Sequence, residues 1–182
     1  MTTEPPASAY DMGHAVEAEN LATFAILVDN EPGVLHRVVG LFAARGYNIE
    51  SLTVAETDET AHTSRITIVT RGTPQVLAQI EAQLEKMVST RHVMNVTADP
   101  NGVQRELALV KVRGTGAERV EALRIAEIFR AHVIDTTPAS FIFEITGASS
   151  KIDKFTELMR PLGLVEMSRT GALSIERGEE TL

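Results

Sequence analysis

The sequence contains no cysteine, no tryptophan and few aromatic residues of any kind. Without cysteine the chain cannot form disulfides, thiolate nucleophiles, zinc ribbons or iron–sulfur clusters, and this fits a cytoplasmic location. Aromatic residues make up only 4% of the chain, so a stacking platform for single-stranded nucleic acid is not expected. No apolar run approaches the roughly 18 residues that a membrane-spanning helix needs. These absences point away from thiol chemistry and from a membrane-embedded protein.

Basic residues are outnumbered by acidic ones. Among 182 residues, 17 Lys and Arg face 25 Asp and Glu, which gives a net charge of −8. Nucleic-acid binders usually carry a basic patch and lipid-binding surfaces a polybasic segment, so neither partner is predicted. With 43% hydrophobic and 23% charged residues, the composition is that of a globular protein, long enough for one large domain or two small ones.

Breaks in composition divide the chain. The first 20 residues contain Pro5-Pro6 and scattered acidic residues but no apolar face, so a disordered tail is predicted there rather than a secretory signal. Asp99-Pro100-Asn101-Gly102 is dense in turn-forming residues and predicts a domain boundary. We therefore expect a tail over 1–20, a first domain over 21–98, a linker over 99–103, a second domain over 104–178 and a short tail over 179–182.

The two halves repeat one order of strands and helices. Apolar runs and alternation predict strands, apolar residues at helical spacing predict helices, and Thr73-Pro74 and Gly46 fit helix ends. A polar loop is expected over 56–62, and Ser149 or Ser150 is expected to cap the last helix. The expected strands are 24–28, 47–55, 65–69, 92–97, 106–112, 133–135, 141–145 and 164–167. The expected helices carry apolar stripes over 35–42, 77–87, 120–129 and 152–162, the first ending before Gly46 and the second beginning at Pro74. This order predicts an α+β fold of tandem ferredoxin-like βαββαβ domains, whose modest cores favour a homodimer.

No pattern in the sequence indicates a reaction centre. The histidines are scattered, with none four residues from another, and surface positions account for them. Gly147-Ala148-Ser149 lacks the closing glycine of a nucleophile elbow, and Gly114-Thr115-Gly116 is better explained as a plain turn than as a phosphate-binding loop. Asp29 and Glu31 are paired carboxylates that could bind a metal, but no third ligand is nearby. Neither catalytic nor metal-binding residues are predicted.

The segment from Val28 to Leu35 has the properties of a ligand-binding loop. It joins a central strand to the start of a helix, where unsatisfied N–H groups and a partial positive charge favour a carboxylate. Gly33 lets a ligand approach the backbone, Asn30 offers a donor and an acceptor, and Val34 and Leu35 supply an apolar wall. The simpler alternative is that Asp29 or Asn30 only caps the helix and Pro32-Gly33 only makes the turn. Spacing alone leaves both interpretations open.

Two longer strings carry a resemblance to a known family. Asp29-Asn30-Glu31-Pro32-Gly33-Val34-Leu35, followed by Arg45-Gly46-Tyr47-Asn48-Ile49-Glu50-Ser51-Leu52-Thr53-Val54, resembles the ACT domain of the small, regulatory subunit of acetolactate synthase. The first element is shared by many ACT domains, and the second is much more specific to this subunit. Residues 105–112, 127–130 and 134–135 resemble its carboxy-terminal domain, so the resemblance extends over about residues 21–178.

The resemblance implies a non-catalytic subunit. In the family this subunit binds a large catalytic subunit that holds thiamine diphosphate, Mg²⁺ and FAD, so no cofactor is expected on this chain. That partner is a transferase that condenses two pyruvates, or pyruvate with 2-oxobutyrate, at the start of branched-chain amino acid synthesis. The small subunit raises its activity and confers feedback inhibition, usually by valine. A free-standing amino-acid-sensing ACT module that regulates another enzyme or transcription is the alternative.

The resemblance also implies where an effector binds. In the family two ACT domains pair side by side in a homodimer, and valine or another branched-chain amino acid lies between them. By position, one protomer would contribute Asn30, Gly33, Val34 and Leu35, and the other Asn48 and Ile49. His36 stands where a small polar residue is common in the family, and no role is assigned to it.

Overall fold

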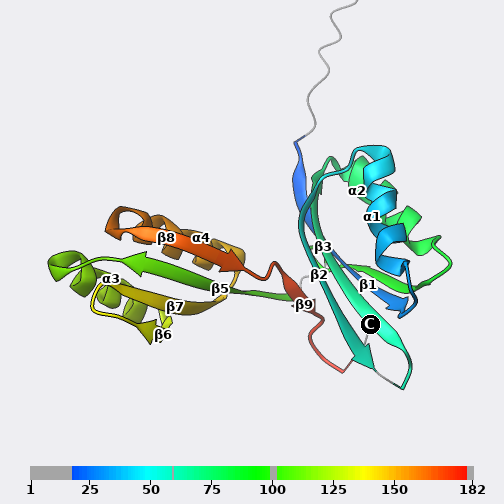
Figure 1. Ribbon diagram of the computed structural model, residues 1–182. Helices are drawn as coiled ribbons and strands as arrows, with labels where there is room; N and C mark the ends of the chain where they lie inside the picture. The colour runs from blue at the N-terminus through cyan, green and yellow to red at the C-terminus, as the bar shows by residue number, and fades with distance from the viewer. Residues whose placement is uncertain (1–17, 59, 99–101, 180–182) are drawn as a thin grey trace, which may run out of the picture.

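The computed structural model describes residues 18–58, 60–98 and 102–179. Within these ranges two βαββαβ units follow one another along the chain, as the sequence predicts (Figure 1). The expected tail over 1–20 and the expected linker over 99–103 lie mainly outside the described residues. The exact domain boundaries therefore stay a prediction.

The first unit is a four-stranded antiparallel sheet with two helices on one face. Its elements are β1 (Asn20–Asp29), α1 (Val34–Arg45), β2 (Ile49–Asp58), β3 (Thr63–Gly72), α2 (Pro74–Glu85) and β4 (Thr90–Asn95). The strand order is β2-β3-β1-β4, so β2 and β4 are the edges. Alternate residues of β1, such as Phe24 and Ile26, are fully buried against Val38 and Phe42 of α1. Every second side chain of the strand points to the helices, and these side chains pack against the apolar stripe of α1 to form the core.

The ends of these elements follow local chemistry. Gly46 caps the C-terminus of α1 in the left-handed conformation at φ +70°, as expected. The Thr73 hydroxyl accepts a hydrogen bond from the Val76 amide at 3.4 Å at the start of α2, also as expected. The polar loop expected over 56–62 is shorter, because β2 continues to Asp58 and stays paired with β3 despite a register shift between Glu56 and Asp58. An edge strand can carry polar, exposed residues, so polarity alone did not mark its end.

The second unit repeats the plan and adds a strand. Its elements are β5 (Val103–Arg113), α3 (Gly116–Phe129), β6 (His132–Thr136), β7 (Ser140–Gly147), α4 (Ser149–Met159), the 3₁₀ turn η1 (Arg160–Leu162), β8 (Leu164–Arg169) and β9 (Leu173–Ile175). The order is β6-β7-β5-β8, and β9 pairs with the start of β5. Phe143 and Phe155 are fully buried in this core. Pro161 lies in η1, where the helix expected to reach residue 162 gives way after Met159.

The expected serine cap of α4 is wrong. The N-cap position is Ala148, and no side chain of the described residues caps the helix. Ser149 is instead the first helical residue, and its hydroxyl donates to the carboxylate of Glu106 on β5. The turn expected over Gly114-Thr115-Gly116 is shorter, because Gly114 and Thr115 connect β5 to α3 and Gly116 is already the first residue of the helix. Among the residues described, no helix is long and apolar enough to cross a membrane.

Candidate functional site

The N-terminus of α1 is open. Gly33 is its N-cap at φ +86°, and a Cβ built on Gly33 meets no atom within 4 Å. The Val34 amide donates to the Glu31 carbonyl at 3.2 Å, and the Arg37 amide to the Gly33 carbonyl at 3.0 Å. Within the described ranges the amides of Leu35 and His36 have no acceptor. A helix start with free N–H groups and an unobstructed approach suits a small carboxylate.

The structure contradicts the alternative that Asp29 or Asn30 caps α1, because in the described part of the chain no side chain makes a capping hydrogen bond to this helix. Asp29 accepts a hydrogen bond from Nε of Arg91 at 2.7 Å, and the Asn30 amide donates to the His62 carbonyl at 2.7 Å. The backbone of the loop is therefore held by its neighbours. The Asn30 side chain is exposed and makes no hydrogen bond to the described part of the protein. Unlike the backbone N–H of Asn30, the side-chain carboxamide is therefore free to bind a ligand.

Of the two residues expected to form an apolar wall beside the ligand, Val34 and Leu35, only Leu35 is exposed. The Val34 side chain is only 7% exposed and packs in the core of the first unit. Leu35 is 38% exposed at the next position of the helix. Successive helical residues point about 100° apart, so the core takes one side chain and leaves the other outside.

Asn48 and Ile49 lie at the other end of the same sheet. In the strand register Ile49 is opposite Thr70, and Thr70 is opposite Ala22. Asn30 follows Asp29 at the far end of β1, and 29 − 22 gives seven residues, or about 23 Å of strand. One chain therefore does not bring the two groups of residues together. Asn48 is exposed, and its carbonyl is held by the Thr70 hydroxyl at 2.6 Å.

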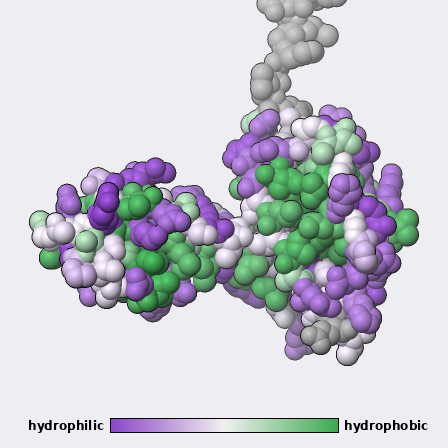
Figure 2. All heavy atoms as spheres, in the orientation of Figure 1, coloured by the Kyte–Doolittle hydropathy of each residue, from purple (hydrophilic) through white to green (hydrophobic). Residues whose placement is uncertain are grey.

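An apolar surface runs along the side of the first unit where β2 and α1 lie (Figure 2). On these two elements Leu35 and Val54 are 38% and 46% exposed, and Ile49 and Leu52 are partly buried. β2 is also an edge strand of its sheet, so one side of its backbone has no partner strand among the residues that the structure describes. An unpaired edge beside exposed apolar side chains is a surface on which a second strand can pair.

The carboxylates of the loop are engaged by arginines. Asp29 pairs with Arg91, and Glu31 pairs with Arg37 at 3.0 Å. In the described part of the chain, no group of three or more His, Asp or Glu side chains could hold a metal ion. Ion pairing thus accounts for both acidic residues of the loop.

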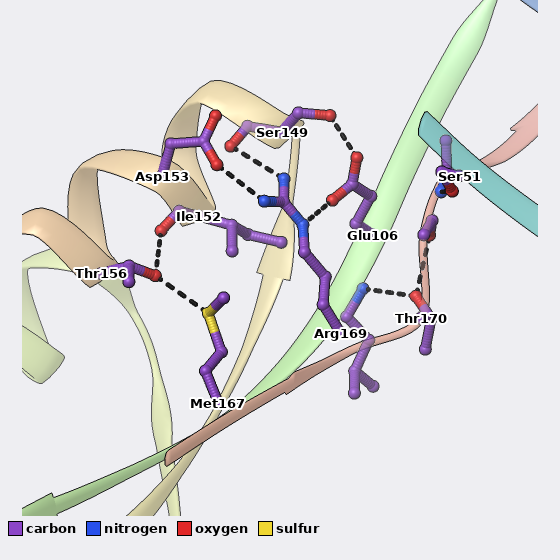
Figure 3. A network of polar contacts seen from close by, with 12 residues as sticks. Ser51, Glu106, Ser149, Ile152, Asp153, Thr156, Met167, Arg169 and Thr170 are labelled. Atoms are coloured by element: carbon purple, nitrogen blue, oxygen red, sulfur yellow. Dashed lines mark hydrogen bonds and ion pairs between the residues drawn. The ribbon is translucent and has the colours of Figure 1, made fainter. Parts of the chain in front are cut away.

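A polar network in the second unit escaped the sequence analysis (Figure 3). The carboxylate of Glu106, only 8% exposed, accepts hydrogen bonds from Arg169 of β8 and Ser149 of α4. Arg169 also pairs with Asp153 at 2.7 Å. Burial alone would lower the pKa of Arg169, but its hydrogen bonds to Asp153 and Glu106 and their charges together raise the pKa. The network ties β5, α4 and β8 together.

A signal for this network was present in the alternation of β5. Glu106, Ala108 and Val110 are alternate residues of one strand, and all three are buried. A carboxylate on the buried face needs a partner, because an unpaired buried charge is costly. The sequence could therefore indicate that Glu106 is paired, but it could not identify Arg169, which lies 63 residues away.

Comparison with known proteins identifies both units. A family model described as an AHAS small subunit-like ACT domain matches residues 24–92, so the first unit is an ACT domain. A model described as the small subunit of acetolactate synthase matches residues 105–178. The chain belongs to the acetolactate synthase small subunit family.

Similarity to individual members extends over most of the chain. The chain is 44% identical over 158 residues to a probable acetolactate synthase small subunit of Archaeoglobus fulgidus, and the match covers 87% of this chain and 98% of the relative. It is 43% identical to the isozyme 3 small subunit of Escherichia coli, covering 87% and 96%. The crystal structure of the acetolactate synthase small subunit from Thermotoga maritima superposes with a TM-score of 0.78 at 39% identity, covering 88% and 99%.

Proposed function

We propose that this chain is the regulatory subunit of an acetolactate synthase. It binds and activates a large catalytic subunit and makes that enzyme sensitive to feedback inhibition by valine. Thiamine diphosphate, Mg²⁺ and FAD belong to the catalytic partner in this proposal. Two features support it: family membership over nearly the whole chain, and an open helix terminus on the ACT domain.

The chemistry at the start of α1 suits a free amino acid. The unpaired amides of Leu35 and His36 would receive the carboxylate, and Asn30 the ammonium group. The exposed side chain of Leu35 and the partly buried Ile49 of a second protomer would contact the isopropyl group. Burying three or four methyl-sized groups contributes about 2–3 kcal/mol. One added methylene alters discrimination by about 1–3 kcal/mol, so leucine and isoleucine compete with valine.

The observation that carries the proposal is the separation of the two motifs. Asn30 and Asn48 stand at opposite ends of one sheet. The edge strand β2 pairs with β3 on one side, and within the described residues its other side has no partner strand and lies beside exposed apolar residues. Pairing two protomers along this edge in antiparallel fashion brings each helix terminus beside the partner's Asn48. A homodimer therefore completes a site that each chain holds only in halves.

Regulation follows from an effector that bridges two protomers. Such a ligand favours the arrangement of the pair that it binds more tightly. Couplings between sites are typically about 1–3 kcal/mol, or roughly 5–150-fold in affinity. The catalytic subunit responds if it binds one arrangement better than the other.

Reconstitution tests this function. The purified chain is mixed with the catalytic subunit from the same organism, and acetolactate formation is measured with and without valine. We expect activation by the chain and inhibition by valine, and we expect Asn30→Ala to remove the inhibition while sparing activation. No change in activity on adding the chain would reject the proposal and would favour a free-standing amino-acid-sensing module.

A further inference from the structure

The second unit touches the first at the strand that begins with the proposed effector residues. The hydroxyl of Thr53 on β2 donates to the carbonyl of Ala172 at 2.8 Å, and the Ala172 amide donates to the hydroxyl of Ser51 at 3.3 Å. Ser51 and Thr53 are two residues apart, so they project from the same face of the strand. Within the described ranges, these two are the hydrogen bonds that join the two units. We call them the β2 clamp.

The clamp requires close approach of the two backbones. Gly171 adopts φ +83°, and a Cβ on this residue would overlap the Ser51 hydroxyl. Ala172 is 2% exposed, so the clamped residue is enclosed. Glycine is needed here both for its left-handed conformation and for the space beside Ser51.

On its other side, the clamped loop is anchored to the core of the second unit. The Thr170 amide donates to the Leu107 carbonyl at 3.0 Å, and the Leu107 amide donates to the Thr170 hydroxyl at 3.2 Å. Arg169, one residue earlier, enters the network with Glu106 and Asp153 (Figure 3). A displacement of Ala172 is therefore passed to β5, β8 and α4 rather than absorbed in a loose loop.

Around the clamp the two units are not packed solidly. A cleft of about 460 Å³ lies between them, with Glu50 and Arg71 of the first unit and Gln104 and Arg169 of the second among its lining residues. Strand β2 itself has a register shift against β3 between Ile49 and Ser51. A bulge interrupts the ladder and bends the strand, so this is where a change in twist is least opposed.

We propose that the β2 clamp transmits effector binding to the second unit. This inference rests on the proposed function, because Asn48 and Ile49 must contact the effector. Binding there shifts the start of β2, the bulge at Glu50 permits the shift, and Ser51 and Thr53 carry it to Ala172. Ser51 and Thr53 are thus positioning residues and do not touch the effector. The cleft gives the second unit room to reorient.

The double variant Ser51→Ala with Thr53→Val removes both hydrogen bonds of the clamp with little change in shape. Thr57→Val is the control, because it repeats one of the two changes, threonine to valine, on the same strand at a hydroxyl that contacts Thr63 and not the second unit. Valine binding to the full chain is measured by calorimetry. Inhibition is measured in the complex with the catalytic subunit as the ratio of activities without and with saturating valine.

We expect the double variant to bind valine within about threefold of the wild-type affinity while the inhibition ratio falls at least fivefold toward one, the low end of ordinary couplings. Hydrogen exchange of residues 170–176 should respond to valine in the wild type and in Thr57→Val but not in the double variant. A merely structural role would instead alter exchange equally with and without valine.

Besides that exchange result, two further results would overturn the inference. In the first, the double variant keeps the inhibition of the wild type and of Thr57→Val. In the second, it loses valine binding itself, which would place Ser51 and Thr53 in the binding site. Failure of the proposed function shows separately, because then the wild-type chain binds no valine or confers no inhibition.

Discussion

Replacing Gly33 by aspartate tests the proposed effector site at its centre, and the cost to folding is small. Residues other than glycine pay about 1–2 kcal/mol in the left-handed region that Gly33 occupies. The new side chain meets no atom within 4 Å at its Cβ, and a carboxylate at a helix N-terminus gains about 0.3–1 kcal/mol. We therefore expect Gly33→Asp to lower the free energy of unfolding by about 0–1.7 kcal/mol.

The cost to binding is larger. An effector carboxylate held by the amides of Leu35 and His36 would lie about 4–6 Å from the new carboxylate, where two like charges repel by about 3–4 kcal/mol at an effective dielectric constant of 20. Solvent and salt screen part of this repulsion, because the site is exposed. A remaining penalty of about 2 kcal/mol weakens binding roughly 30-fold. The aspartate also competes for the same amides.

Gly33→Asn is the matched control. It has nearly the same size and tolerates the left-handed conformation, but it carries no charge. Calorimetric titration of valine into each chain should show a loss of up to about tenfold for asparagine and a clearly larger loss for aspartate. Thermal unfolding of both variants checks that the fold is retained. Equal losses for the two variants, or wild-type affinity in Gly33→Asp, would refute the placement of the carboxylate at the start of α1.

Three further changes test the packing and the charges. Phe143→Ala should lower the free energy of unfolding by about 3–5 kcal/mol in urea titrations, because the ring is fully buried, and a loss below 1 kcal/mol would contradict this core. Arg169→Leu leaves the carboxylate of Glu106 buried without its countercharge and should cost about 2–3 kcal/mol, less than a fully buried pair because Arg169 is 26% exposed; unchanged stability would show that the pair contributes nothing. Burial and the charge of Glu85 raise the pKa of Glu81, so its ionised form destabilises the fold above that pKa and the penalty disappears below the ordinary value of 4.5. Glu81→Gln should therefore stabilise by a few tenths of a kcal/mol at pH 7 in urea titrations and by nothing at pH 4; equal gains at both would contradict the charge argument.

The order of elements could be predicted because each depends on neighbouring residues. The glycine at 46 and the threonine at 73 end and begin helices through contacts within one turn of the chain. The apolar run of β1 predicts a buried strand, and the stripe on α1 predicts the helix face that packs against it. Local signals that agree in this way determine the fold without knowledge of distant contacts.

The features that the sequence could not predict depend on residues far away along the chain. Ser149 has the side chain of a helix cap, but Glu106 lies near enough to take its hydroxyl. Val34 and Leu35 are equally apolar in sequence, and only the position of the core decides that Val34 is buried. The clamp between Thr53 and Ala172 spans 119 residues of sequence and carries no local signal. Tertiary pairing overrides local preference in each case.

The arrangement of the candidate site restricts the symmetry of any pair that completes it. Asn30 and the end of β2 lie at one end of the sheet, and Asn48 lies at the other. Only an antiparallel approach of two β2 edges brings the partner's Asn48 to the end where Asn30 stands. A two-fold axis makes the contact reciprocal, so the pair forms two equivalent sites and binds one effector per chain. A parallel approach of the same edges would place Asn30 near the partner's Asn30 and Asn48 near the partner's Asn48. Neither site would then be complete. The stoichiometry of valine binding therefore reports the direction of the pairing as well as the number of sites.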